Sequence, residues 1–276
     1  MKLIHSFKTL NKDTKFYNLI WCTALSCLYA KESGFNIKLY TDSIAYEYLK
    51  YLPYDEIEVS LDDLSIVKSI YANSKYEALK NEPLDSIHID CDVFIKSKNF
   101  KNELNFENND LIVQSLEQYI VLDNTLRNTL LDFWQSAIDN VIPYYKPDWV
   151  KDYPDKMYNC GIIGFNNQEL KNEFIKQYEE GIKILNTHND KIKGNLLIDV
   201  VVEQQYLYDL CKFKNYKVKK VFDLKDLQQE AIIKGYQHLI GDSKNKYITK
   251  IKQLVYKKDW NLYNTLNNLI NKNGRY

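Results

Sequence analysis

The sequence predicts an α/β protein with a Rossmann-type, mostly parallel sheet flanked by helices. Short apolar segments typical of buried strands alternate with longer segments of helical period from the first residue onward. Several boundaries between them carry glycine, proline or a helix-capping residue. With 276 residues, 45% of them hydrophobic, the chain can bury a sizeable core. Alternation of this kind favours βαβ units, in which neighbouring strands run parallel.

The N-terminal third of the chain alternates most clearly. Apolar residues with helical spacing over residues 16–32 stop at Ser33-Gly34, and glycine commonly follows a helix end. Ser43 is placed to cap the next helix, which Pro53 ends. Strands are expected at 1–7, 36–40 and 57–59 and within 84–95, and helices at 16–32, 44–50 and 69–80.

The rest of the chain alternates in the same way, and its C-terminal segment has helical period. Residues 140–156 hold three of the five prolines together with several aromatic residues, which predicts an irregular loop. The expected strands lie at 111–115, 157–165 and 216–222, and the expected helices at 122–138, 168–185, 196–212 and 247–270. We expect residues 1–246 to form one domain and residues 247–276 to extend it as helices.

Charge and cysteine content exclude several classes of protein. Lys and Arg number 37 against 37 Asp and Glu, and this balance argues against a dedicated nucleic-acid binder. No run of apolar residues has the length of a membrane span, and the first residues lack the apolar core of a signal peptide. The five cysteines form no CxxC pair and are expected to be free thiols. We therefore expect a cytoplasmic protein; contact with the inner membrane face stays open.

The strongest local signal is the segment His88-Ile89-Asp90-Cys91-Asp92. In an extended strand, Asp90 and Asp92 would share one face with His88, while Ile89 and Cys91 would face the core. Neighbouring carboxylates repel each other unless a cation neutralises them, and ligands bind at the carboxyl ends of strands in open α/β sheets. The pattern favours a divalent cation that also contacts a diphosphate. A solvated strand end that carries two acids by chance is the alternative.

Three further features strengthen the first interpretation. Asn159-Cys160-Gly161-Ile162-Ile163-Gly164 places two of the chain's eight glycines in a strand, where glycine weakens pairing unless a backbone must approach a ligand. Glu203-Gln204 follows an apolar helical stretch. His238-x-x-Gly241-x-x-Lys244 offers an imidazole for a metal, a glycine for close approach and an ammonium for phosphate. Considered without its neighbours, His238 would be a structural histidine held by hydrogen bonds. Glu203 would in the same way be an acid on a helix surface.

Other polar and aromatic residues carry weaker signals with equally plain alternatives. Thr41-Asp42 ends a strand at the ligand edge and would contact a nucleotide or cap a turn. Aromatic residues in the proline-rich loop would stack on an acceptor sugar or fill the core; they are Tyr144, Tyr145, Trp149 and Tyr153. Lysines of the C-terminal helical segment would contact anionic phosphate or form a solvated face; they are Lys250, Lys252, Lys257 and Lys258.

Taken in their order along the chain, these motifs resemble those of GT-A-fold glycosyltransferases. The chain is most similar to glycosyltransferase family 8 and its DxD-containing branch, of which it would be a distant relative. The resemblance runs from the first strand to about Lys244. It implies a GT-A-like fold, a nucleotide-sugar donor such as a UDP-sugar, Mn²⁺ or Mg²⁺, and transfer to the hydroxyl of a glycan or another acceptor, with retention.

The resemblance also implies roles for individual residues. Asp90, Asp92 and His238 would hold the metal, and Asp90 would also lie near the donor ribose. Glu203 and Gln204 would be the catalytic pair near the donor sugar. The remaining donor-binding residues would be Asp42, Lys75, Asn159, Gly161, Gly241 and Lys244.

Two other functions stay open at this point. One is a nucleotide- or carbohydrate-binding protein without turnover, although intact paired carboxylates together with His238 and Lys244 argue against it. The other is a metal-dependent nucleotidyltransferase, a class that normally carries a glycine- and arginine-rich loop after the first strand. The residues that follow the first strand here, Lys8-Thr9, do not form such a loop. Modified DNA also remains open as an acceptor.

Overall fold

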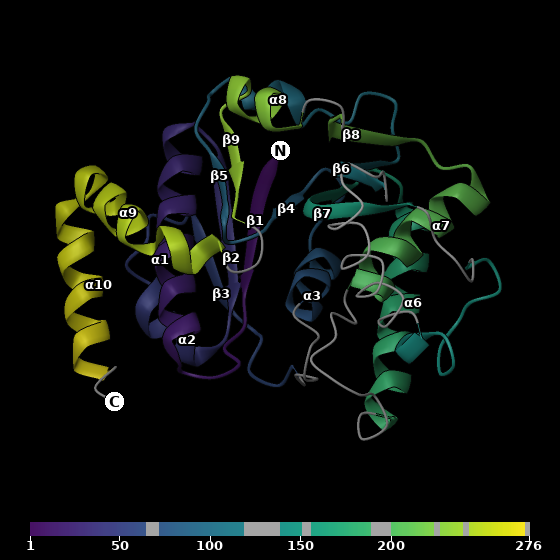
Figure 1. The fold of residues 1–276 in the computed structure, drawn as a ribbon, viewed down its shortest axis with the longest axis horizontal. Helices are drawn as coiled ribbons and strands as arrows, with labels where there is room; N and C mark the ends of the chain where they lie inside the picture. Colours follow the sequence, from purple (N-terminus) through teal and green to yellow (C-terminus); the bar gives the residue numbers. More distant parts are fainter. Residues whose placement is uncertain are drawn as a thin grey trace, which may run out of the picture. The chain divides into compact units, whose positions relative to one another are not determined.

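The computed structural model in Figure 1 describes most of the chain. The described residues are 1–64, 72–118, 139–150, 156–188, 200–223, 227–239 and 243–273. The chain forms two compact units. Unit 1 comprises Met1–Leu64, Asp85–Asn105 and Asp226–Tyr276, and unit 2 comprises Ser65–Leu84 and Phe106–Lys225.

Unit 1 contains four parallel strands in the order β3-β2-β1-β4. They are β1 (Lys2–Phe7), β2 (Asn36–Thr41), β3 (Glu56–Val59) and β4 (Ile87–Ile89). Leu3 pairs with Ile37 on one side and with Ile87 on the other, and all three side chains are fully buried. The strand order therefore changes direction at β1, and the carboxyl ends of β1 and β4 form a topological switch point, where ligands bind in open α/β sheets.

The first two helices of unit 1 begin and end at capping residues. Helix α1 (Thr14–Glu32) is followed by Gly34, whose φ of +77° is the left-handed conformation typical of a glycine after a helix. Helix α2 (Ser43–Leu49) is capped by Asp42, whose side chain accepts a hydrogen bond from the Ala45 N–H. The expectation that Ser43 caps this helix was wrong, because the aspartate one residue earlier takes that position.

The segment after β4 differs from the predicted continuous strand. The Val93 N–H donates to the Asp90 carbonyl oxygen (2.9 Å), which closes a turn over residues 90–92. Strand β5 (Val93–Ile95) then pairs antiparallel with β9 (Tyr236–His238) in a separate two-stranded ribbon. The alternation of faces predicted for His88, Asp90 and Asp92 therefore does not hold, because both aspartates lie in the turn.

The C-terminal segment of unit 1 forms two long helices where one was expected. Helix α9 (Ser243–Lys258) packs on α1 and on α10 (Trp260–Asn273), as Figure 1 shows. Asp259 separates them, and its side chain accepts a hydrogen bond from the Leu262 N–H as an N-cap does. Two short helices, α4 (Phe100–Glu103) and α8 (Leu227–Ile233), were not predicted.

Unit 2 contains three strands in the order β7-β6-β8, of which β6 and β8 are parallel and β6 and β7 antiparallel. The strands are β6 (Leu111–Gln118), β7 (Lys156–Phe165) and β8 (Val218–Phe222). Its helical segments include α3 (Asn73–Asn81), α6 (Gln168–Thr187), α7 (Tyr206–Lys214) and a π-helical turn, η1 (Val200–Gln205). The helix predicted at 122–138 lies outside the described residues.

The α/β class and the mostly parallel strands flanked by helices are confirmed. All five cysteines are buried free thiols, as expected. Among the described residues, none of the helices combines the length and the apolar character that crossing a membrane requires.

A glycine-to-alanine pair tests the backbone geometry of unit 1. At Gly235 φ is +68°, and an added Cβ would lie 2.7 Å from Ser97 Cβ, so we expect Gly235→Ala to destabilise the protein by about 3 kcal/mol. At Gly34 φ is also positive, but the nearest atom would be Lys101 Nζ at 3.7 Å, so we expect about 1 kcal/mol for Gly34→Ala. Urea unfolding measures both; equal costs would contradict the described packing at Ser97.

Candidate functional site

The two aspartates of the D-x-D motif lie at the switch point of unit 1. The turn that carries them follows β4 directly, beside the carboxyl end of β1. Cys91 faces inward, and its Sγ donates to the Ser6 carbonyl oxygen of β1 (3.4 Å). The carboxylate of Asp90 is partly exposed (31%), whereas that of Asp92 is buried (7%). The turn therefore fixes the two acids at the edge where a ligand is expected.

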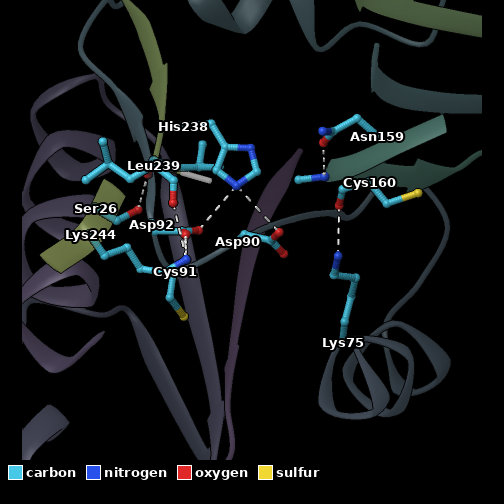
Figure 2. Close-up of polar contacts among 12 residues, drawn as sticks. Ser26, Lys75, Asp90, Cys91, Asp92, Asn159, Cys160, His238, Leu239 and Lys244 are labelled. Atoms are coloured by element: carbon cyan, nitrogen blue, oxygen red, sulfur yellow. Dashed lines mark hydrogen bonds and ion pairs between the residues drawn. The ribbon is translucent and has the colours of Figure 1, made fainter. Parts of the chain in front are cut away.

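The ribbon of β5 and β9 brings His238 to these aspartates. His238 lies opposite Val93 in the ladder, and the Leu239 N–H donates to the Asp92 carbonyl oxygen (3.1 Å). His238 Nε2 lies 3.4 Å from Asp92 Oδ1 and 3.9 Å from Asp90 Oδ2 (Figure 2). One potential ligand atom from each of the three residues lies within 4.8 Å of the others. The predicted metal-binding residues thus form one cluster.

Lys244, in the first turn of α9, completes the cluster. Its Nζ forms an ion pair with Asp92 Oδ2 and donates to the Leu239 carbonyl oxygen (3.2 Å), as Figure 2 shows. Burial on its own raises the pKa of Asp92, but the charges and hydrogen bonds of His238 and Lys244 outweigh it and hold that pKa well below its usual range. Asp92 therefore stays ionised, with its Oδ1 facing the His238 imidazole and its Oδ2 paired with the Lys244 ammonium.

His88, on β4, lies next to the Asp90 carboxylate. It is 1% exposed, its Nδ1 lies 3.8 Å from Asp90 Oδ1, and its Nε2 lies 2.9 Å from Ser6 Oγ. His88 therefore packs beside the cluster.

The chemistry of these side chains fits a divalent cation. Carboxylate oxygens are preferred ligands of Mg²⁺ and Mn²⁺, and imidazole is common at transition metals. The two carboxylates and the imidazole lie close enough together to contact one ion. Their chemistry suits Mn²⁺ best and Mg²⁺ second.

A second cluster lies within unit 2 around Glu203, in the π-helical turn η1. Lys75 Nζ of α3 contacts Glu203 Oε1 (2.7 Å) and the Cys160 carbonyl oxygen of β7 (2.9 Å). The Tyr76 hydroxyl also donates to Glu203 Oε1 (3.2 Å). Lys75 and Glu203 are 5% and 4% exposed, so the helix-surface alternative for Glu203 was wrong. π-Helical turns often occur at functional sites.

Asn159 and Gly161 are linked to each other in β7. The Asn159 side chain accepts a hydrogen bond from the Gly161 N–H (3.0 Å) and donates to Glu117 Oε1 of β6 (2.7 Å). Both residues are buried, and Gln204 is half-buried. The donor-binding and catalytic roles of these three residues stay predictions.

Asp42 and Gly241 were also predicted to bind the donor. The buried carboxylate of Asp42 caps α2 and also accepts from the Thr9 N–H (2.5 Å) and the Thr9 hydroxyl (3.0 Å), which is the turn-cap alternative. Its predicted contact with the nucleotide is not tested by these bonds. Gly241 lies outside the described residues.

The aromatic residues of the proline-rich loop have contacts within unit 2. The Tyr144 ring lies 4.6 Å from that of His188, and the Trp149 ring meets Tyr206 edge-on. Tyr145 is buried and donates to the Gln177 carbonyl oxygen. These contacts are those expected of packing residues; Tyr153 lies outside the described residues.

Sequence reasoning missed several partners of the candidate residues. Glu117, Tyr76 and Ser6 contact Asn159, Glu203 and His88, respectively. Ser6 had a usable signal, because a polar residue near the end of a buried strand often faces a site. Glu117 and Tyr76 had none, because each meets its partner only through the tertiary fold.

The fold and the cluster define an α/β protein with an acidic, imidazole-containing site at a topological switch point. The chain belongs to the family of unknown function DUF6734, which matches residues 1–273. No curated protein matches it. Among solved structures it is similar to the galactosyltransferase LgtC in complex with donor and acceptor sugar analogs, with 12% identity and a TM-score of 0.48 over 93% of this chain and 96% of that one.

Proposed function

We propose that the protein is a metal-dependent glycosyltransferase. It would move a sugar from a nucleoside-diphosphate donor, first of all a UDP-sugar, to an acceptor hydroxyl with retention. The observation that carries the proposal is the convergence of Asp90, Asp92, His238 and Lys244 at the carboxyl end of β4. The motif order read from the sequence supports the donor class and the stereochemistry.

The residues of this cluster have two roles in the proposal, holding the cation and binding the diphosphate. Asp90, Asp92 and His238 would hold the cation, which when bound stabilises negative charge on a diphosphate leaving group. His88 lies beside Asp90, and the backbone of Leu239 anchors both Asp92 and Lys244. Lys244 carries a compact point charge suited to phosphate, and its ion pair keeps Asp92 ionised before a ligand binds.

The remaining assignments rest on the motif order. Asp42, Lys75, Asn159, Gly161 and Gly241 are proposed to bind the donor, and Glu203 and Gln204 to act on the sugar. Gln204 is the most informative to change, because it is half-buried and its loss should leave the core intact. We expect Gln204→Ala to lower kcat without changing the urea midpoint; an unchanged kcat would remove Gln204 from the site.

Product analysis tests the reaction class. The protein is incubated with labelled UDP- and GDP-sugars in Mn²⁺ or in EDTA, and the slow hydrolysis that occurs without an acceptor is followed. A released nucleoside diphosphate supports glycosyl transfer, and NMR of the released sugar gives its anomeric configuration. Pyrophosphate release from nucleoside triphosphates supplied with a sugar phosphate would indicate a nucleotidyltransferase. Binding without any turnover would indicate a binding protein.

The matched variants are Asp92→Asn and Asp63→Asn, since Asp63 is an exposed carboxylate of unit 1 outside the cluster. We expect the first to slow donor cleavage by about 100-fold or more, because it removes charge at the point where the leaving group is stabilised. We expect the second to leave the rate unchanged. Equal rates in both variants would contradict the proposal.

A further inference from the structure

A pocket lies in unit 1, on the face of the β5–β9 ribbon opposite to His238. Successive side chains of a strand point to opposite faces, so Gln237 faces this pocket while its neighbour His238 faces Asp90 and Asp92. The pocket has a volume of about 180 Å³ and is bounded by α1, β5, β9 and α9. This is similar to a cavity of about 150 Å³ that holds one benzene ring.

The floor of the pocket is apolar. Leu25 of α1, Phe94 of β5 and Ile251 of α9 line it, and each is at most 2% exposed. Tyr29 and Tyr247 also line the pocket. An apolar body the size of one ring would be removed from water here, which is favourable.

The rim of the pocket is cationic. Lys96 and Lys250 both line it, and neither has a carboxylate partner among the described residues; Lys96 Nζ donates to the neutral Gln237 Oε1 (2.8 Å). Burial lowers the pKa of Lys96, and the positive charge of Lys250, which lines the same pocket, lowers it further. An anion placed between them would relieve that repulsion.

From these observations we infer that this pocket binds a small anion with an apolar body, a carboxylate or phosphate head on a group of about one ring. The head would lie between Lys96 and Lys250, and the body on the apolar floor. The site is separate from the Asp90, Asp92 and His238 cluster and does not depend on the proposed glycosyltransferase function.

Calorimetric titration of the full chain in EDTA tests the inference, because EDTA keeps divalent cations off the acidic cluster. The probes are phenyl phosphate, benzoate, inorganic phosphate and the uncharged benzyl alcohol. The variants are Lys96→Gln, Lys250→Gln and, as the matched control, Lys257→Gln, an exposed lysine of α9 that does not line the pocket. Far-UV circular dichroism verifies that each variant is folded.

We expect phenyl phosphate or benzoate to bind at one site per chain and more tightly than inorganic phosphate or benzyl alcohol. Each of the two rim variants should weaken this binding about fivefold, and Lys257→Gln and Asp92→Asn should not. The relative affinities of phenyl phosphate and benzoate identify the preferred head group. The inference is overturned if neither aromatic anion binds, if benzyl alcohol binds as tightly, or if both rim variants bind like the wild type.

Discussion

Replacing Lys75 with methionine is expected to destabilise the protein by about 3–5 kcal/mol. Lys75 and Glu203 form a buried ion pair of 2.7 Å that joins α3 to η1, and Lys75 also holds the Cys160 carbonyl oxygen of β7. The variant leaves the Glu203 carboxylate buried without this cation, and an uncompensated buried charge is costly. Urea unfolding followed by tryptophan fluorescence measures the loss.

Two further variants separate the buried charge from the loss of packing. The double variant Lys75→Met/Glu203→Leu should regain most of the lost stability, because it removes both charges together. Lys80 lies on the same helix and pairs with Glu179 of α6 at 2.6 Å, but both side chains are about half exposed. Lys80→Met should therefore cost less than about 1 kcal/mol. If Lys75→Met and Lys80→Met lower the free energy of unfolding by similar amounts, the destabilisation does not come from a buried Glu203 carboxylate left without its cation.

Acidification is expected to destabilise the protein through His5. The His5 ring is fully buried; Ser26 Oγ donates to the Val93 carbonyl oxygen, so the ring donates from Nε2 to Ser26 and accepts from Tyr54 at Nδ1. Burial lowers the pKa of His5 from 6.5 to about 3, against the opposing charge of Asp92. Between these values only the unfolded chain binds the proton, so the free energy of unfolding falls by about 1.4 kcal/mol per pH unit as pH falls.

Unfolding in urea at a series of pH values from 7 to 4, in wild type and His5→Gln, measures this dependence. Glutamine provides a donor and an acceptor but does not titrate, so the variant should show a shallower loss of stability towards acid even if its stability at pH 7 is lower. His188→Gln, at the C-terminus of α6, controls for the loss of a histidine as such. If the free energy of unfolding of His5→Gln falls with pH as steeply as that of the wild type, His5 does not carry the effect.

Local patterns were sufficient to predict most elements of the fold. Capping residues and apolar periodicity located α1, α2 and α6 to within two residues, because these signals act within one or two helical turns. The break at Asp259 was missed, because aspartate is compatible with a helix interior and only the packing of α9 and α10 on their neighbours fixes the bend.

The candidate site could be predicted in its residues but not in its shape. Asp90, Asp92 and His238 were identified from their types and order, and the structure brings them together. Local sequence does not show that the chain turns at the D-x-D motif, because the strand that follows it, β5, pairs with β9, far along the chain, and not with a neighbour of β4. The same reason hides the contact of Lys75 with Glu203, which are 128 positions apart.

Manganese binding tests the central claim most directly. Mn²⁺ is titrated into wild type, Asp92→Asn, His238→Gln and the control Asp63→Asn, each with and without UDP, and free Mn²⁺ is followed by electron paramagnetic resonance. We expect one Mn²⁺ per chain, bound more tightly with UDP, and an affinity at least about tenfold lower in Asp92→Asn and His238→Gln but unchanged in the control. Absence of Mn²⁺ binding in the presence of UDP, or equal binding in all four proteins, would contradict the assignment.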